Sequence, residues 1–456
     1  MRLSDDSTEK EPRKTKGKLV KPPTVPDNPR IASVQPPDKP CSYEEWRAVI
    51  QDNFPDLLFS AEICLSIISQ ILITDITNPF ALVLVDVPSA GKTITLNFFA
   101  EIDQLTYATD KFTPASFVSN AANVKKEKLV EVDLLPRIKN KTLIVRDLAT
   151  IFSKRDDDLN ELLGILTRVL DGEGLNTESG VHGARHYTGS FLFMLLAAST
   201  PIPHKVWNMM GSLGSRLFFL NMNAEDKSND ELADLLGSNT HKDKERVCRE
   251  ATQRFLQTLW SKHQLGVAWD GEQDDRSQKL VIARCAQLLA RLRGVVNVYN
   301  EKGGNGETYS YTTPIVEKPT RINQLLYNLC RGHAVASGRI HLTSDDMRYA
   351  VEIAIDSAPT TRTKLLRQLL ETGELSTTQA EAILDCSKPT ASKEMKTLAV
   401  LGIGSLVKDR SGKVGGQDQT LRLNGMFEWF LGDECRAIRL LEPINKENLT
   451  PWDASE

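Results

Sequence analysis

A short apolar run that leads into a glycine-lysine-threonine sequence is the clearest chemical signal in this chain. Residues 80–93 read FALVLVDVPSAGKT, and the apolar part predicts a parallel strand buried on both faces. Gly91, Lys92 and Thr93 match the end of the phosphate-loop pattern G-x-x-x-x-G-K-[ST]. In such a loop, backbone N–H groups and the start of the next helix surround phosphates. The lysine reaches the β- and γ-phosphates, and the threonine hydroxyl holds Mg²⁺.

Asp86 departs from this pattern, because the first position of the motif belongs to glycine. Aspartate tolerates unusual backbone angles better than most residues, so the loop can still form. A carboxylate so near phosphates is nonetheless unexpected. A chance Gly-Lys-Thr after a strand is the alternative interpretation, and the strand–loop–helix order favours the nucleotide site. The predicted nucleotide-binding residues are Asp86, Val87, Pro88, Ser89, Ala90, Gly91, Lys92 and Thr93.

A second strand, residues 142–145, is followed by Asp147, which we predict to hold Mg²⁺ together with Thr93. An ordinary aspartate at the end of a strand is the alternative. Leu148 stands where an ATPase usually has a glutamate that polarises the attacking water. Either another carboxylate does this work, or hydrolysis is slow or absent. The candidate replacements are Asp156, Asp157, Asp158 and Glu161.

Two further strands carry polar residues at their ends. Thr200 follows the apolar run 190–198 and is placed to contact a γ-phosphate or to orient water. Arg216 directly precedes the run 217–222. It is either a surface arginine that caps a helix or a finger that reaches the nucleotide of a neighbouring subunit. Polar residues outside the carboxyl ends of strands are typical of ligand sites in open α/β sheets.

The composition is that of an ordinary globular protein. Of the 456 residues, 40% are hydrophobic and 25% are charged, and a net charge of −4 indicates no whole-chain preference for nucleic acid or membrane. The seven cysteines show no metal-binding spacing, which favours reduced thiols. An apolar leader and a run of 18 apolar residues are both missing. We therefore expect a cytoplasmic protein without a membrane partner.

Five parts are expected along the chain. Residues 1–40 hold eight prolines and a basic cluster, which predict a disordered tail. Apolar strands alternate with helical stretches over 41–225, so this part is expected to be an α/β core with a parallel sheet. Helical periodicity dominates 226–358. Three helices and a hairpin over 360–430 predict a winged helix-turn-helix, and 431–456 is expected to be a loosely attached tail.

The order of these motifs resembles that of an AAA+ ATPase with a P-loop NTPase core. Within that superfamily it is most similar to the minichromosome-maintenance (MCM) helicase and the related helix-insert branch. The resemblance covers about 76–358, and a winged helix after the lid is also a feature of that branch. The segments that carry it, besides the phosphate loop and Asp147, are residues 197–201 (AASTP), 215–216 (SR), 319–321 (PTR), 338–339 (GR) and 346–350 (DMRYA).

This resemblance implies ATP as the nucleotide, a helical lid over 226–358 and assembly into a ring. The implied catalytic residues are Lys92, Asp147, Thr200 as first sensor, Arg216 as a finger acting on a neighbouring subunit, and Arg321 as second sensor. In that branch a hairpin facing the DNA channel occupies the place of residues 172–187. Arg185 and His186 are therefore DNA-contact candidates, with a mobile surface loop as the alternative. The chain departs from the branch at Asp86 and Leu148, and it lacks the zinc-bearing N-terminal domain of MCM proteins.

The winged helix supplies a second set of DNA-contact candidates. Lysine and arginine side chains contact phosphates, and a wing commonly adds basic residues beside a recognition helix. A winged helix that binds another protein is the alternative. The predicted contacts are Lys388, Lys393 and Lys396 on the third helix, with Lys408 and Arg410 in the wing.

Together these features predict a cytoplasmic, ring-forming AAA+ ATPase that uses ATP and Mg²⁺ to remodel or unwind DNA. A replicative, plasmid or phage-related helicase or helicase loader fits best, with replication proteins as further partners. Two alternatives stay open. One is a nucleotide-gated DNA-binding switch without hydrolysis, which Leu148 favours, and the other is a protein remodeller whose winged helix docks a partner.

Overall fold

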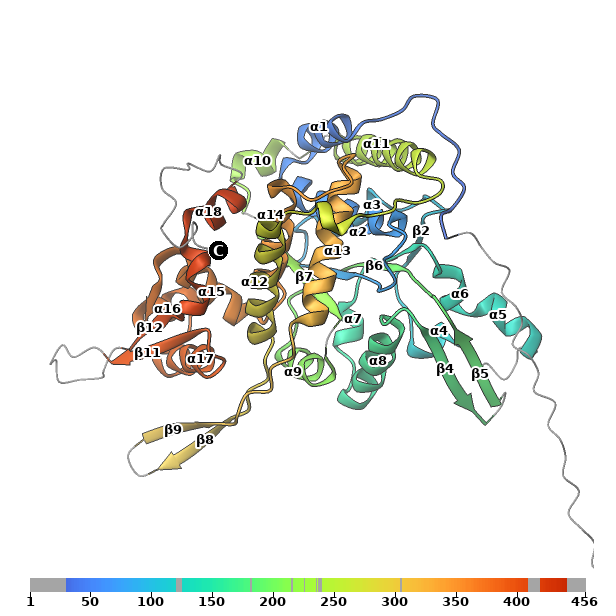
Figure 1. Ribbon diagram of the computed structural model, residues 1–456. Coiled ribbons are helices and arrows are strands. Elements are labelled where there is room, and N and C mark those ends of the chain that lie inside the picture. The colour runs from blue at the N-terminus through green and yellow to red at the C-terminus, as the bar shows by residue number, and fades with distance from the viewer. Residues whose placement is uncertain are drawn as a thin grey trace, which may run out of the picture.

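Five runs of the sequence form a parallel sheet at the centre of the protein (Figure 1). The strands are β1 Ala81–Val85, β2 Thr106–Thr109, β3 Thr142–Val145, β6 Met194–Ser199 and β7 Leu217–Asn221, in the order β2-β3-β6-β1-β7. All four pairings between neighbours are parallel, so the predicted α/β core with a parallel sheet is confirmed. This computed structural model describes residues 30–119, 125–180, 183–214, 216–224, 226–234, 236, 240–303, 306–408 and 419–440.

Side chains of the sheet alternate between two apolar cores, one on each face. Leu82 of β1 belongs to the core that contains α2 Leu58–Ser69. Val83 belongs to the opposite core, which is formed with α8 Asp156–Val169 and α9 His204–Leu213. Because both faces are covered, β1 is apolar and buried at every position, as the sequence predicts.

Six further helices pack on the α2 side of the sheet. They are α1 Tyr43–Asn53, α3 Lys92–Asn97, α11 Thr240–Lys262, α12 Arg276–Leu292, α13 Thr320–Ala336 and α14 Ser344–Asp356. The helix α13 packs so closely along α2 that a Cβ on Gly332 would lie 2.0 Å from the Ser66 carbonyl oxygen. Within the described residues, one segment is long and apolar enough to cross a membrane, Pro55–Leu72. It is 83% buried, as a core helix is.

The residues at the end of α14 cover the outer edge of β7. Ser357 Oγ accepts a hydrogen bond from Phe219 N at 2.9 Å and donates one to Phe219 O at 3.1 Å. The Asp356 carboxylate accepts a hydrogen bond from Asn221 N at 2.9 Å. These side chains bind the backbone groups that a further strand would otherwise pair with.

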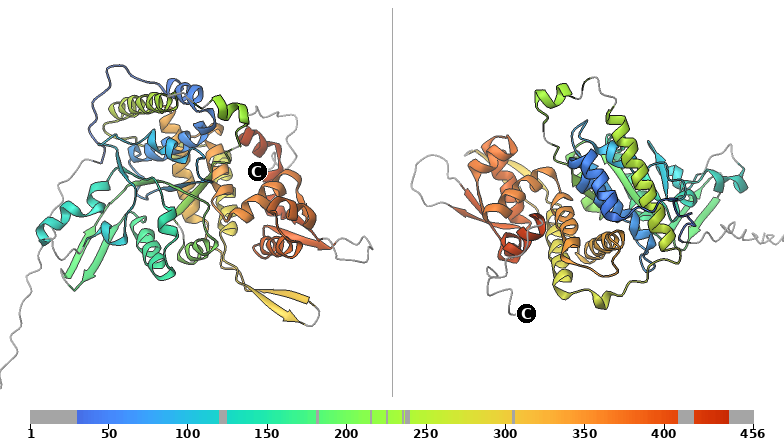
Figure 2. Two further views of the ribbon diagram at one scale, coloured as in Figure 1. Left: turned by 180° about the vertical axis from the view of Figure 1, so that it is seen from behind. Right: turned by 90° about the horizontal axis from the view of Figure 1, so that it is seen from above.

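Two antiparallel hairpins project from the body of the protein (Figure 1). The strands β4 Gly174–Ser179 and β5 Gly183–Thr188 pair within the segment for which a hairpin is predicted. The second hairpin joins β8 Val298–Gly303 to β9 Gly306–Tyr311. Figures 1 and 2 show the β4–β5 hairpin and the C-terminal unit at opposite ends of the molecule.

The C-terminal unit contains three helices and a three-stranded antiparallel sheet in the order β10-β12-β11. Arg362 fixes this unit to the end of α12, because its Nη1 donates to Leu292 O at 2.7 Å and Gly294 O at 2.8 Å. The elements are α15 Thr360–Thr372, β10 Glu374–Ser376, α16 Thr377–Leu384, α17 Lys388–Val400, β11 Gly404–Lys408 and β12 Gln419–Leu423.

Both ends of the described chain are better packed than the sequence suggests. Of the tail predicted for 1–40, residues 1–29 lie outside the described chain, and residues 30–34 pack on the core: Ile31 and Val34 are buried, and Arg30 donates to the Ile73 carbonyl at 2.6 Å. The tail predicted for 431–456 begins with α18 Asp433–Leu440, in which Cys435 is buried. The short elements not yet named are η1 Pro55–Leu57, η2 Gln70–Leu72, α4 Pro114–Phe117, η3 Lys126–Lys128, α5 Leu129–Val132, α6 Leu134–Ile138, α7 Ala149–Phe152, α10 Asn229–Asp234, η4 Gly271–Gln273 and η5 Gly425–Leu431.

Candidate functional site

Three strand ends bring the predicted nucleotide and metal residues to one edge of the sheet. The strands β1, β6 and β3 are hydrogen-bonded neighbours that run in the same direction. The loop 86–91 follows β1, Thr200 follows β6, and Asp147 lies two residues past the end of β3. All three therefore lie at the carboxyl edge, where open α/β sheets bind their ligands.

The Lys92 ammonium is held over the phosphate loop. Its Nζ donates to Asp86 O at 2.8 Å and to Val87 O at 2.6 Å. An ammonium has three N–H donors, so one remains for a further acceptor. The loop closes on Gly91, which takes a φ of +84°, and a Cβ there would lie 2.6 Å from a methyl group of Leu57. Glycine is therefore required at this position, as the motif predicts.

The charges of two carboxylates affect the pKa of Lys92. Burial lowers the pKa of Lys92, whereas the negative charges of Asp86 and Asp147 oppose this shift. The charge of Asp147 thus acts on the ammonium of Lys92. Both residues lie at the carboxyl edge of the sheet, where the sequence predicts the nucleotide and its metal ion.

Asp86 and Ser89 give the loop an unusual conformation. The Asp86 carboxylate accepts hydrogen bonds from Val87 N at 2.7 Å and from Ala224 N at 3.0 Å. Ser89 has a φ of +69°, which is uncommon for a residue with a side chain. Such conformations cluster at ligand-binding sites, where the surrounding structure maintains them.

The predicted metal ligands Thr93 and Asp147 flank this loop. The Thr93 side chain is exposed. One carboxylate oxygen of Asp147 accepts a hydrogen bond from Ala149 N at 2.7 Å, and the second has no such partner within the described residues. In that part of the chain, no three His, Cys, Asp or Glu side chains come together as a metal-binding group. Mg²⁺ commonly takes one or two protein carboxylates and completes its shell with phosphates and water.

Leu148 cannot polarise water, and its position is enclosed. The side chain is 1% exposed, and its backbone N donates to Ala198 O at 2.8 Å. Of the predicted replacements, Asp156 pairs with Lys205 at 2.9 Å and Asp158 lies 3.5 Å from Arg155. The other two predicted replacements, Asp157 and Glu161, are exposed and form no ion pair within the described chain.

Arg216 lies at the opposite edge of the sheet, away from the phosphate loop of its own chain. Leu217 pairs with Ala81 at the amino end of β1, so one strand length of about 16 Å separates Arg216 from the loop. Its Nε and Nη2 donate to Asp171 Oδ1 at 3.1 and 3.0 Å, and Nη1 donates to Gly214 O. Arg216 is 9% exposed, so Asp171 holds its guanidinium in the single chain, and the pair would have to open for Arg216 to reach a neighbouring copy.

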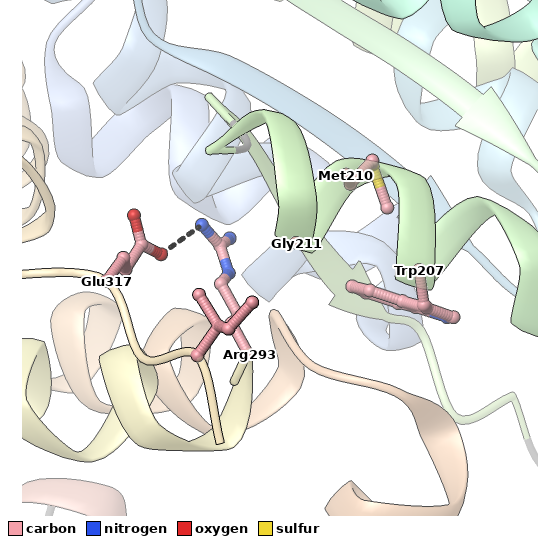
Figure 3. A pocket seen from close by; sticks show the side chains of 6 residues that line it. Trp207, Met210, Gly211, Arg293 and Glu317 are labelled. Carbon is pink, nitrogen blue, oxygen red and sulfur yellow. Dashed lines mark ion pairs between the residues drawn. The ribbon is translucent and has the colours of Figure 1, made fainter. Parts of the chain in front are cut away.

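Glu317 lies near several arginines at this amino edge, and Figure 3 shows one of them, Arg293, facing its carboxylate. Arg293 Nη1 lies 4.0 Å from Glu317 Oε1, beside a cavity of about 20 Å³. Burial lowers the pKa of Arg293 to about 10. Burial also raises the pKa of Glu317, although the charges of Arg293, Arg321 and Arg216 act against that shift. Arg321 is exposed and makes no hydrogen bond or ion pair with the described residues. The predicted finger and second sensor therefore act on the charge of the same carboxylate, that of Glu317.

The structure argues against the predicted DNA contact of Arg185. This residue is 8% exposed and forms an ion pair with Asp133, which is completely buried. Tyr187 donates to the same carboxylate at 2.5 Å, and Arg185 also donates to Ser119 O. The guanidinium thus fixes the β4–β5 hairpin to the core. His186, the neighbouring candidate, is exposed.

The lysines predicted to bind DNA lie on or next to α17 and beside the β8–β9 hairpin. Lys388 and Lys396 are exposed, and Lys393 is half-buried. Lys396 Nζ lies 4.7 Å from the centre of the Tyr311 ring, and Tyr311 OH donates to Lys393 O at 3.3 Å. Lys408 ends β11, and Arg410 lies outside the described residues. The Gly-rich segment 300–313 was expected to be a loop or a hairpin, and it forms the β8–β9 hairpin. Its position beside the basic helix was not expected from the sequence.

Several residues of the two edges carry no sequence signal that could have identified them. Asp171, Arg293 and Glu317 belong to no motif, and only the fold brings them to Arg216 and Arg321. The buried Ser199 Oγ, at the end of β6, has no hydrogen-bond partner in the described structure.

No model of a known protein family matches this chain, and no curated protein matches it.

Proposed function

We propose that this protein is an AAA+ type ATPase that binds ATP at the loop 86–93 and acts on DNA as a ring-shaped assembly. One observation carries the proposal. The Lys92 ammonium is fixed over its loop by two carbonyl groups, keeps one N–H donor, and lies near the Asp147 carboxylate. A cation with a free donor beside a metal-binding carboxylate suits a nucleotide triphosphate with Mg²⁺.

The residues present fit both groups. Lys92 would hold the β- and γ-phosphates, while the exposed Thr93 hydroxyl and the open oxygen of Asp147 would hold Mg²⁺. The nucleotide supplies a phosphoanhydride bond whose cleavage releases free energy. The protein would contribute the positioning of the phosphates, because the turn at Gly91 would present backbone N–H groups and the buried strands keep the loop rigid.

The position of the arginines favours an assembly in which copies stack head to tail. Arg216 and Arg321 lie at the amino edge, a strand length from the loop of their own chain. An arginine that stabilises the charge of phosphoryl transfer must touch the phosphates. If these residues do so, they serve the site of the next copy, as a heterologous contact that closes into a ring allows.

Leu148 supports a second candidate, a nucleotide-gated switch without hydrolysis. The buried leucine removes the group that usually activates water, and Lys205 already engages Asp156. Such a protein would bind ATP, change its assembly or its DNA affinity, and release the nucleotide unchanged. Asp157 and Glu161, both exposed, are the carboxylates left to activate water.

The C-terminal unit supports DNA as the partner. Its order of helix, strand, two helices and two strands is compatible with the winged helix expected from the sequence, and α17 has lysines at three positions. The experiment that tests the proposal measures ATP turnover by the purified protein with and without duplex DNA. Turnover that DNA stimulates supports a motor, and binding without turnover supports the switch. An ATP turnover that is the same with and without DNA favours a protein remodeller.

We expect the α17 lysines to contribute to DNA affinity by neutralising phosphates. Replacing Lys388, Lys393 and Lys396 with alanine should weaken binding to any duplex and flatten its salt dependence. For each phosphate that the variant no longer neutralises, the slope of log affinity against log salt should change by about 0.9. Titrations at several salt concentrations measure this slope. Lys364→Ala, an exposed lysine on α15, is the matched control. An unchanged slope would place the DNA site elsewhere.

A further inference from the structure

The Asp86 carboxylate joins two segments that are 138 residues apart in the chain. Its Oδ1 accepts a hydrogen bond from Val87 N at 2.7 Å, and its Oδ2 accepts one from Ala224 N at 3.0 Å. A glycine, which the phosphate-loop pattern requires here, could make neither bond. The departure from the motif therefore creates a link between the loop and the chain that follows β7.

Ala224, the second partner of Asp86, lies at the start of the segment that connects β7 to α10 and α11. Met222 N still donates to Val85 O at 3.1 Å, which extends the pairing of β7 with β1. Asn223 then takes a φ of +50°, and the chain turns away from the sheet. In the described part of 226–236 the hydrogen bonds are local, such as those between Ser228 and Glu231. Within the described residues of this connection, the hydrogen bond from Ala224 N is the last one that reaches the loop.

Charge makes the link sensitive to what the loop binds. Asp86 and Asp147 both act on the Lys92 ammonium, and phosphates of a nucleotide would bind that ammonium. The triphosphate would bring several negative charges close to a carboxylate that has no cation of its own among its hydrogen-bond partners. Like charges repel one another, and more strongly the less water lies between them.

We propose that Asp86 is a nucleotide-responsive tether. In the free protein its carboxylate holds Ala224 against the phosphate loop, and bound phosphates push the carboxylate away and free the connection to α10 and α11. This inference rests on the proposed nucleotide site and extends it, since it names the residue through which occupancy of the loop reaches the helical part of the chain.

Amide hydrogen exchange of the full-length protein tests the tether directly. The probe is a non-hydrolysable ATP analogue with Mg²⁺. In the unmodified protein we expect the amide of Ala224 to exchange about tenfold faster, or more, once the analogue is bound. Asp86→Asn keeps the shape and an oxygen acceptor but removes the charge. It should bind the analogue about 5- to 150-fold more tightly, the usual range of coupling between two linked events.

The variant should also show little further change in exchange at Ala224 when the analogue binds. Asp385→Asn, an equal loss of charge in the C-terminal unit, is the control for affinity. Analogue binding that leaves exchange at Ala224 unchanged in the unmodified protein overturns the tether and leaves the nucleotide site intact. That measurement needs no variant, so it decides the question even if Asp86→Asn fails to fold. If the unmodified protein, Asp86→Asn and Asp86→Gly all fail to bind the analogue, the nucleotide site itself is wrong and the tether falls with it.

Discussion

Replacing Lys92 with alanine is expected to reduce the affinity for an ATP analogue by about 10- to 150-fold. The ammonium is the only group of the loop that can offer a full positive charge to the phosphates, and a hydrogen bond to a charged group is worth about 1.5–3 kcal/mol. The substitution also removes the two bonds to Asp86 O and Val87 O that fix the loop. Equilibrium binding of a labelled analogue in the presence of Mg²⁺ gives the affinity.

Lys111→Ala is the matched control for this experiment, because Lys111 is an exposed lysine whose replacement removes the same charge elsewhere on the core. Circular dichroism of both variants separates a loss of binding from a loss of folding. If Lys92→Ala binds the analogue as well as the unmodified protein does, the loop 86–93 is not a phosphate loop in function, and the ATPase proposal has to be abandoned.

Replacing Arg216 with alanine is expected to lower turnover by about 10³-fold and to leave nucleotide binding unchanged. An arginine that reaches a neighbour's nucleotide is worth about 10³–10⁵ in rate. The same change breaks the bonds to Asp171 and Gly214, so we also expect the free energy of unfolding to fall by about 1–3 kcal/mol. Steady-state turnover and chemical denaturation measure the two effects.

Asp171→Asn separates catalysis from stability, because it weakens the same ion pair and keeps the guanidinium. We expect this variant to lose stability as Arg216→Ala does and to retain turnover. Mixing Arg216→Ala with Lys92→Ala tests action between copies, since each protein supplies what the other lacks and turnover should partly return. A variant Asp171→Asn that is as inactive as Arg216→Ala, with no recovery on mixing, would make Arg216 a purely structural clamp.

The strands and the glycine turn of the loop 86–91 could be predicted because their signals are local. A buried parallel strand is apolar at every position, and Gly91 and Lys92 are neighbours whose types the loop geometry demands. The strands β3 and β6 follow the same rule, so Asp147 and Thr200 could be expected at the same edge as the loop. Periodicity and residue type were sufficient for this part of the site.

The fate of individual charged side chains could not be predicted in this way. Arg185 was expected to face DNA, yet it pairs with Asp133, 52 residues earlier, because a buried carboxylate needs a cation. Arg216 pairs with Asp171 at a separation of 45 residues, and here the buried partner that needs an opposite charge is the arginine. Such ion pairs depend on how helices and strands pack against one another. The sequence around each residue does not predict that packing.

The hydrogen bonds that cover the outer edge of β7 have a practical consequence for the choice of fragments of this protein. The boundary near residue 225 separates the sheet from the helices in sequence, but Asp356 and Ser357 supply the bonding partners of the last strand. A fragment that stopped at this boundary would expose an apolar strand with open N–H and C=O groups, a surface prone to aggregation. The smallest piece that can be studied alone therefore extends at least to residue 357.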